Sequence, residues 1–344
     1  MKQFTRLNII VLAVLFFGTI ANVQSQTTSV FTAGLNRPTK VINADDVMLV
    51  SESGTTAPNS GRISIIDSDS GVRSTLLSGL PSGVNNLGGP PDADGTTGIC
   101  LRGRKLYVTS GVGDAVTRGP TPPIELPTGT PSSPLFDSVL ELTLPRHLGA
   151  LVSGFTLTAA NQATLAGGTD VVLTNAQGRR LRVHLVANLP DYIPLPLPGR
   201  PDNVKASHLF GVAAFGGHLY LADAGLNLIH RVNLFTGSVR TFVRFPNKPN
   251  PMFPMVGGPF IEAVPDNIHV DRNRLLVPLL TGFPFVPGLS EIQSVRLRFP
   301  HRRRTFIPNL TSAIDVLRVT DDEDNDDEDD FAMFDPKEIG RAHV

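Results

Sequence analysis

The amino-acid sequence predicts an all-β protein built from repeated four-stranded antiparallel sheets. One observation is composition: the 344 residues include 32 glycines and 29 prolines, and 41% are hydrophobic against 18% charged. A chain this apolar is expected to fold, and its glycine and proline content is typical of a turn-rich fold rather than a helical one. The second observation is a strand pattern that recurs along the chain with constant internal spacing.

The recurring pattern is a hydrophobic triplet with an aliphatic residue eight positions before its middle member. It occurs four times, at residues 47–52, 105–110, 218–223 and 274–279. The preceding aliphatic residues are Val41, Ile99, Val212 and Ile268. Each copy therefore predicts a strand, a tight turn and a second strand, as around the Gly216-Gly217 turn.

Two further strands are predicted after the first and the third copies of the pattern. They lie at residues 62–66 and 72–77, and at residues 228–234 and 238–245. Four antiparallel strands joined by glycine-containing turns are typical of a β-propeller blade. The sequence therefore predicts a β-propeller with four-stranded antiparallel blades, six in the complete protein and an incomplete set in this chain.

The second blade is predicted to carry a long insertion. The interval between the second and third copies of the pattern is about twice the others, which fits either a hidden blade or an insertion. Strand-like segments at residues 138–144 and 179–189 fit the third and fourth strands of the second blade, which favours an insertion at residues 145–178. A fifth blade is predicted to begin with a strand at residues 312–319, with the acidic run 321–330 in its first turn.

The two ends of the chain predict processing and truncation. Residues 1–25 have the positive start, short apolar stretch and small residues of a secretory signal peptide, and the stretch is too short to span a bilayer comfortably. We expect the mature chain to be secreted, either extracellular or, in a bacterium, periplasmic, and to have no membrane span. Residues 339–344 match the translation of a common sequencing adapter, so we expect residues 26–338 to be an incomplete β-propeller domain.

The charge distribution argues against a nucleic-acid partner. The net charge is −1 at pH 7, and residues 321–330 hold nine acidic residues, so the remainder is mildly basic. Its basic residues are scattered except for Arg302, Arg303 and Arg304. We expect a monomer in which the acidic run 321–330 is a solvated loop or, alternatively, a weak Ca²⁺ site.

Motifs for catalysis, metal binding or a cofactor are missing from the sequence. The eight histidines are dispersed, Cys100 is the only cysteine, and no nucleotide-binding or nucleophile-elbow pattern occurs. Residues 67–71 and 92–95 resemble parts of calcium loops but lack the distal glutamate, so hairpin turns explain them. We therefore expect no catalytic residue, metal or cofactor, and one glycosylation acceptor at Asn309 if the source is a eukaryote.

The candidate ligand-binding residues occupy equivalent positions near the end of a strand in successive blades. Three residues after the middle of each triplet stand Glu52, Ser110, Asp223 and Leu279. Because blades place equivalent residues around one axis, Glu52, Ser110 and Asp223 are predicted to lie at the channel mouth. Carboxylates that converge there could hold a cation that polarises a carbonyl, as in a hydrolase or lactonase. Alternatively, each carboxylate caps its own strand by accepting N–H bonds from the following turn.

Three short phrases in the sequence are more specific to a protein family than the strand pattern is. They lie at residues 30–38, at residues 207–212 leading to 222–225, and at residues 280–288. In these phrases the chain resembles the ScyD/ScyE family of secreted β-propeller proteins with NHL-like repeats. The resemblance implies the fold and export, and it leaves the activity open. Rather than an enzyme, we expect a binding or scaffold module whose loops, including residues 282–288 and 145–178, contact a protein, glycan or small-molecule ligand.

Overall fold

The computed structural model of the chain describes residues 28–318. The chain divides into a short N-terminal unit, residues 1–33, and a main unit that starts at Gly34. Residues 28–33 contain no helix or strand, so every element below belongs to the main unit.

Three segments with predictions of their own lie outside the described residues. They are the predicted signal peptide 1–25, the acidic run 321–330 and the adapter-like residues 339–344. Within residues 28–318, no helix is both long enough and apolar enough to cross a membrane.

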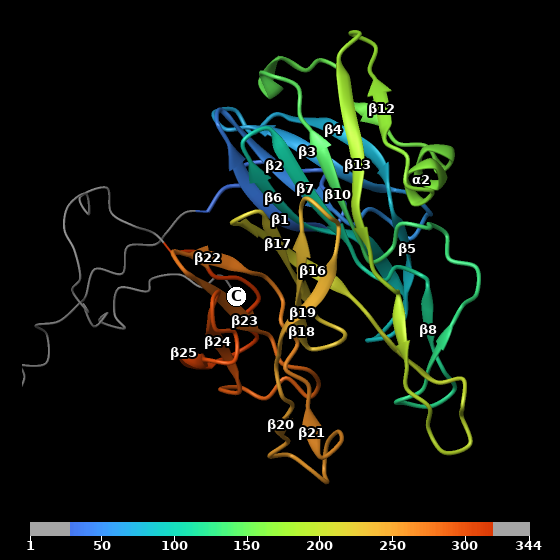
Figure 1. Cartoon of the computed structure of the whole chain (residues 1–344), viewed down its shortest axis with the longest axis vertical. Helices are drawn as coiled ribbons and strands as arrows, with labels where there is room; N and C mark the ends of the chain where they lie inside the picture. The colour runs from blue at the N-terminus through green and yellow to red at the C-terminus, as the bar shows by residue number, and fades with distance from the viewer. Residues whose placement is uncertain (1–27, 319–344) are drawn as a thin grey trace, which may run out of the picture. The chain divides into compact units, whose positions relative to one another are not determined.

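Four antiparallel sheets follow one another along the main unit in a four-blade β-propeller arrangement (Figure 1). Blade 1 contains β1 (Pro38–Ala44), β2 (Val47–Glu52), β3 (Gly61–Asp67) and β4 (Arg73–Leu80). Blade 2 contains β6 (Asp92–Arg102), β7 (Lys105–Ser110), β10 (Ser138–Thr143) and β13 (Arg180–Asn188). Blade 3 contains β16 (Leu209–Phe215), β17 (His218–Asp223), β18 (Leu228–Asn233) and β19 (Val239–Arg244). Blade 4 contains β22 (His269–Asp271), β23 (Arg274–Leu279), β24 (Ser290–Arg296) and β25 (Arg303–Leu310).

This arrangement confirms the predicted all-β class and the four-stranded antiparallel blades. The count of six blades for a complete protein stays a prediction. Shorter strands flank or connect the blades: β5 (Ser82–Asn85) beside β6, β8 (Val116–Arg118) with β9 (Glu125–Pro127), β14 (Tyr192–Pro194) with β15 (Val204–Ala206), and β20 (Lys248–Pro249) with β21 (Phe260–Ile261).

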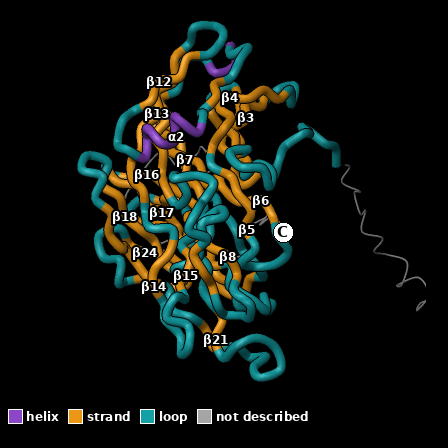
Figure 2. The backbone as a smooth tube through the Cα atoms, turned by 90° about the vertical axis from the view of Figure 1, so that its right-hand side faces the viewer, coloured by secondary structure: helices purple, strands orange, loops and turns teal. Residues whose placement is uncertain are grey.

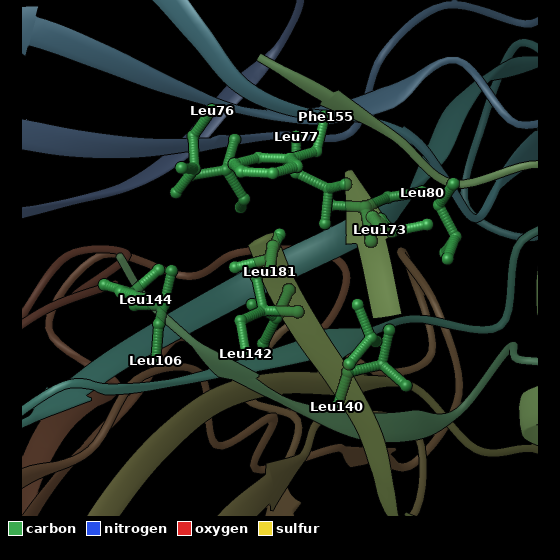
Figure 3. Packing of buried hydrophobic residues seen from close by; sticks show 14 of the residues in the cluster. Leu76, Leu77, Leu80, Leu106, Leu140, Leu142, Leu144, Phe155, Leu173 and Leu181 are labelled. Atoms are coloured by element: carbon green, nitrogen blue, oxygen red, sulfur yellow. The ribbon is translucent and has the colours of Figure 1, made fainter. Parts of the chain in front are cut away.

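The second strand of each blade is almost entirely buried. In β7, β17 and β23 every residue after the first is buried, because neighbouring strands cover the edges and neighbouring layers cover both faces. A strand buried on both faces is a continuous apolar run, which explains why these segments dominate the sequence pattern. Figure 3 shows the packing between blades 1 and 2, where leucines of β4 face leucines of β7, β10 and β13, with Phe155 beside Leu77.

Threonine side chains of β1, β6 and β7 join blades 1, 2 and 3. Thr39 Oγ1 of β1 donates to the Thr97 carbonyl of β6 at 2.7 Å. Thr97 Oγ1 donates to the Leu209 carbonyl at 2.9 Å, and Thr109 Oγ1 donates to the Phe210 carbonyl at 2.9 Å. These bonds fix the relative positions of β1, β6 and β16, the strands that border the pocket described below.

Residues 145–178 form a bridge between blades 1 and 2 and no additional blade. They contain η1 (Leu148–Ala150), β11 (Phe155–Thr156), α2 (Ala159–Ala166) and β12 (Val171–Thr174). β11 pairs in parallel with β4 of blade 1, whereas β12 pairs with β13 of blade 2, beside which α2 lies (Figure 2). The buried Gln162 side chain of α2 accepts a bond from Ser133 Oγ at 2.6 Å and donates to the Gly79 carbonyl at 2.8 Å.

The predicted first strand of a fifth blade, residues 312–319, is wrong over its described part, because residues 312–318 form no strand. A segment of strand-forming residues becomes a strand only where a neighbouring strand edge accepts its backbone. Here side chains hold the segment instead. The Ala313 amide donates to Ser290 Oγ at 2.8 Å, Asp315 contacts Lys40 of β1, and Arg318 Nη1 lies 2.7 Å from Asp271 Oδ1 of β22.

Candidate functional site

A pocket of about 660 Å³ opens where blades 1, 2 and 3 meet. Its volume falls in the range of small-molecule binding sites. Its wall includes Arg37 and Thr39 from blade 1, Asp94 and Thr97 from blade 2, and His208 and Phe210 from blade 3. The pocket thus depends on the threonine bonds that fix β1, β6 and β16 relative to one another.

The Asp94–His208 pair supplies two opposite charges in the pocket wall. His208 Nε2 lies 3.1 Å from Asp94 Oδ1, and Asp94 also accepts bonds from the Gly113 amide at 2.9 Å and from Asn85 Nδ2 at 3.2 Å. Burial disfavours charge on the imidazole, but the Asp94 carboxylate overcomes this and raises the pKa of His208 to about 9. Burial likewise opposes ionisation of Asp94, yet the charge of His208 lowers the pKa of this carboxyl below its usual value. Both groups are therefore charged near pH 7.

A glycine makes room for the His208 ring. A Cβ atom placed on Gly111 would lie 2.5 Å from His208 Cδ2 and Nε2, closer than any real contact. The Gly111 backbone is fixed in turn, because its amide donates to the Gly95 carbonyl at 2.7 Å and its carbonyl accepts from the Asp137 amide at 3.1 Å. The close approach between β16 and the end of β7 therefore requires glycine at position 111.

Arg37 and Asp92 form a second oppositely charged pair on the pocket wall. Their side chains contact each other and connect the residues before β1 to the β5–β6 hairpin. The tip of this hairpin contributes Gly88 and Gly89 to the pocket, and open space surrounds the Cβ position of both glycines.

Glu52 lies behind the pocket and positions Arg37. Its buried carboxylate accepts bonds from the Asn36 amide and from Ser64 Oγ, each at 2.5 Å, and lies 2.7 Å from Arg62 Nη2. The next residue continues this anchorage, because the Ser53 amide donates to the Arg37 carbonyl at 3.0 Å. Glu52 therefore fixes the backbone from which the Arg37 side chain extends.

Asp223 plays the same part for His208 in blade 3. Its buried carboxylate accepts bonds from Ser207 Oγ at 2.8 Å and from the His208 amide at 3.1 Å. It also accepts the Leu226 amide of the following turn at 2.9 Å and lies 3.1 Å from His230 Nε2. Burial opposes its ionisation, but the His230 bond and the backbone bonds lower the pKa of Asp223. The bond to Leu226 is the kind of turn cap that the sequence offered as one alternative.

Ser110 and Leu279 occupy the equivalent positions of blades 2 and 4. Ser110 Oγ donates to the Leu135 carbonyl at 2.5 Å, and Leu279 is buried in the core of blades 3 and 4. The positional equivalence deduced from the sequence is thus present in the structure, but each residue serves its own blade. None of Glu52, Ser110 and Asp223 lines the pocket, and direct contact of these residues with a ligand stays a prediction.

Asp137 is a further buried carboxyl that sequence reasoning did not single out. Its Oδ1 accepts the Leu209 amide at 2.9 Å, whereas its buried Oδ2 has no hydrogen-bond partner. Burial, and then the nearby charge of Asp223, raise the pKa of Asp137 well above its usual value. Asp137 and Asp223 together hold the backbone of residues 207–209, which carries His208 into the pocket.

Other residues considered in the sequence have simple structural settings. Asp67 Oδ1 accepts the Ser70 amide at 2.7 Å, so residues 67–71 form the expected hairpin turn. Residues 92–95 instead begin β6 and carry Asp94. Asn309 is exposed near the end of β25, and its glycosylation stays a prediction. Across residues 28–318, no cluster of three or more histidine, cysteine, aspartate or glutamate side chains is arranged to hold a metal ion.

Comparison with known proteins concerns the fold alone. No protein-family model and no curated protein matches the chain. Among solved structures, the chain is similar to one in a nidogen/laminin complex, with 11% identity, a TM-score of 0.36, and coverage of 78% of this chain and 62% of that chain. The chain thus spans less than two thirds of that protein.

Two sugar dehydrogenases are also similar in fold. A putative glucose dehydrogenase from Thermus thermophilus shares 17% identity, with a TM-score of 0.31 and coverage of 82% of this chain and 86% of that chain. The PQQ-bound aldose sugar dehydrogenase from Streptomyces coelicolor shares 14% identity, with a TM-score of 0.31 and coverage of 82% and 84%. At these scores the similarities say nothing about what this chain binds. Its own geometry defines a β-propeller protein with a charged pocket between three blades.

Proposed function

We propose that this chain is a ligand-binding β-propeller and that the pocket between blades 1, 2 and 3 is its binding site. The observation that carries the proposal is the Asp94–His208 pair, in which a cation and an anion are fixed 3.1 Å apart in the pocket wall. Charged groups with set partners provide strong, directional hydrogen bonds to a ligand. Glu52 and Asp223 support the site by positioning Arg37 and His208.

The pocket favours a neutral ligand that carries several hydroxyl groups. Its charges cancel in two ion pairs, Asp94 with His208 and Arg37 with Asp92. A strongly charged ligand would have to break one of these ion pairs to bind. The remaining polar wall consists of hydroxyl and amide groups, and the Phe210 ring adds an apolar face. A ligand hydroxyl group can accept a hydrogen bond from a cationic side chain and donate one to a carboxylate at the same time. Of the predicted partners, a glycan or a small sugar-like molecule fits best.

A hydrolase or lactonase is the second candidate, because an Asp–His pair at a pocket is also the apparatus of acid–base catalysis. With a pKa of about 9, His208 holds a proton near pH 7 and would act as a general acid. The test is turnover of γ-butyrolactone and p-nitrophenyl acetate by the wild type, His208→Gln and, as a control outside the pocket, the exposed His301→Gln. Turnover that only His208→Gln abolishes would favour the enzyme.

The family and the location are parts of the same proposal. We infer a secreted protein of the ScyD/ScyE type from the leader and from the three sequence phrases, and the propeller arrangement is the fold that this resemblance implies. Recovery of the mature chain from culture medium, with residues 1–25 removed in its intact mass, would support export. A cell-retained chain that keeps Lys2 would contradict it.

The binding proposal is tested by filling the pocket. Gly88→Trp adds a large side chain to the wall of the pocket at a position with open space around its Cβ, whereas Gly258→Trp adds one in open space elsewhere and serves as the matched control. Thermal shift and calorimetry with glucose, galactose, mannose, N-acetylglucosamine, cellobiose and maltose should identify at least one sugar that binds the wild type and the control. Gly88→Trp should lose that binding. Binding that survives Gly88→Trp, or a complete lack of sugar binding, would contradict the proposal.

A further inference from the structure

A cluster of exposed arginines covers the β24–β25 hairpin of blade 4. We call it the arginine surface; it consists of Arg296, Arg298, Arg302, Arg303 and Arg304. No aspartate or glutamate occurs between residues 292 and 314. Within the described part of the chain, none of these five arginines forms an ion pair with a carboxylate. The surface therefore carries positive charge that nothing in residues 28–318 neutralises.

Aromatic rings hold three of these guanidinium groups in place. Arg298 and Arg302 lie 5.5 Å and 5.3 Å from the centre of the Phe299 ring. Arg303 lies 6.0 Å from the centre of the Phe245 ring, and its Nη1 donates to the Arg244 carbonyl at 3.0 Å. A guanidinium stacked on a ring keeps its N–H edge available, and that edge matches a carboxylate in two parallel hydrogen bonds. The arginine surface can therefore bind carboxylates.

We propose that the acidic run 321–330 of the same chain binds the arginine surface. The run supplies nine carboxylates in ten residues, the chemistry that the surface accepts. It also begins close by, because Arg318 is held 2.7 Å from Asp271 at the end of β22. Asp271 belongs to the same sheet and the same end of the sheet, where Arg274 faces Arg296 and Val295 faces Arg303.

The distances allow this contact. Three strand spacings separate β22 from β25, or about 15 Å at about 4.8 Å per spacing. Residues 319–330 can span about 40 Å when extended at about 3.3 Å per residue. The run therefore reaches every arginine of the surface from its anchor at Arg318 without any change in blade 4.

The proposed contact should weaken when salt or a competing polyanion is added. A tethered segment experiences a local concentration in the millimolar range, so weak contacts suffice to keep it bound. The five arginines are exposed to solvent, so dissolved ions screen their attraction for carboxylates within about 10 Å at 0.1 M salt. Sulfated or carboxylated polymers should therefore compete with the run for the arginine surface.

The test replaces residues 321–330 with a neutral Gly-Ser sequence of equal length. This neutral-run variant should elute from heparin-agarose at a higher salt concentration than the wild type, because its arginine surface is uncovered. A fluorescein-labelled peptide of residues 321–330 should bind the neutral-run variant, and its affinity should fall about tenfold or more between 50 and 200 mM NaCl. Fluorescence anisotropy measures that binding, and the wild type should bind the peptide much more weakly.

Two further variants assign the site. In the neutral-run background, changing Arg298, Arg302 and Arg304 to Gln should abolish peptide binding. The control variant changes the exposed Arg179 and Arg180, at the start of β13, to Gln. It should leave peptide binding intact. Three results would each overturn the proposal. The wild type and the neutral-run variant could elute from heparin at the same salt concentration, or the Gln changes in blade 4 could leave peptide binding unchanged. The third is a wild-type mass that doubles with protein concentration at low salt. The last result would show that the run binds a second copy instead.

Discussion

The His208 imidazole lies 3.1 Å from the Asp94 carboxylate, and this pair connects the loop before β16 in blade 3 to β6 in blade 2. The pair therefore couples the stability of the propeller to the charge state of its pocket. The folded protein raises the pKa of His208 from 6.5 to about 9, with Asp94 as the cause that overcomes burial.

The first prediction is a loss of stability at alkaline pH. A raised pKa means that His208 stabilises the fold fully below about pH 6.5 and loses this contribution as the pH rises through about 9. A shift of this size corresponds to about 3 kcal/mol. The difference in free energy of unfolding between the wild type and His208→Gln should therefore shrink by about that amount between pH 6 and pH 10. Urea denaturation measures it, and a difference that stays constant with pH would exclude the ion pair.

The second prediction concerns Asp137, whose folded pKa is raised by burial and by Asp223. A carboxyl with a raised pKa destabilises the fold increasingly as the pH rises above its unfolded value near 4. Asp137→Asn does not titrate and can still accept the Leu209 amide. Relative to the wild type, this variant should therefore become more stable between pH 5 and pH 8. Parallel urea titrations at the two pH values check this, and identical pH profiles would contradict it.

The third prediction is that Glu52 and Asp223 are needed for stability as well as for the site. Glu52→Gln leaves the Arg62 guanidinium without its carboxylate, and Asp223→Asn weakens bonds to Ser207, His208, Leu226 and His230. Each change should cost about 3 kcal/mol, because breaking a buried charged pair leaves one partner unsatisfied. Direct contact of these carboxylates with a ligand would instead predict little loss of stability, so thermal denaturation separates the two roles. A melting temperature within a degree of the wild type would favour direct ligand contact over positioning.

The fourth prediction tests the packing beneath His208. Gly111→Ala should destabilise the protein by about 1–3 kcal/mol, since its Cβ would lie 2.5 Å from the imidazole. It should also weaken ligand binding by displacing the ring. Gly258→Ala, with open space at the same atom, should change neither property. If the two alanine variants behave alike in calorimetry, the close approach of Gly111 and His208 is not present in solution.

Much of the blade structure could be predicted from the sequence because the signals are local. The second strands are short apolar runs, and constant spacing placed Glu52 and Asp223 at equivalent ends of β2 and β17. The pocket could not be predicted, since Asp94 and His208 are 114 positions apart and meet only through packing of blades 2 and 3. Glu52 and Asp223 end equivalent strands, as the spacing predicts, whereas Arg37 and His208, which border the pocket, lie in segments that these carboxylates hold.

Two other features depend on tertiary neighbours that no local pattern reveals. The segment 312–318 contains strand-forming residues, yet side chains such as Asp315 hold it where no strand edge receives its backbone. The insertion 145–178 sends β11 across to β4, a parallel pairing with blade 1 that nothing in its own sequence specifies.

The most direct test of the binding site is an NMR titration of the His208 ring, assigned by the resonance that His208→Asn removes. We expect a pKa of about 9 in the free protein. We also expect the His208 ring resonances to shift when a neutral sugar that binds is added, while those of the exposed His301, which does not line the pocket, stay in place. A His208 pKa near 6.5, or a bound sugar that leaves the His208 resonances unchanged, would contradict the assignment of this pocket as the binding site.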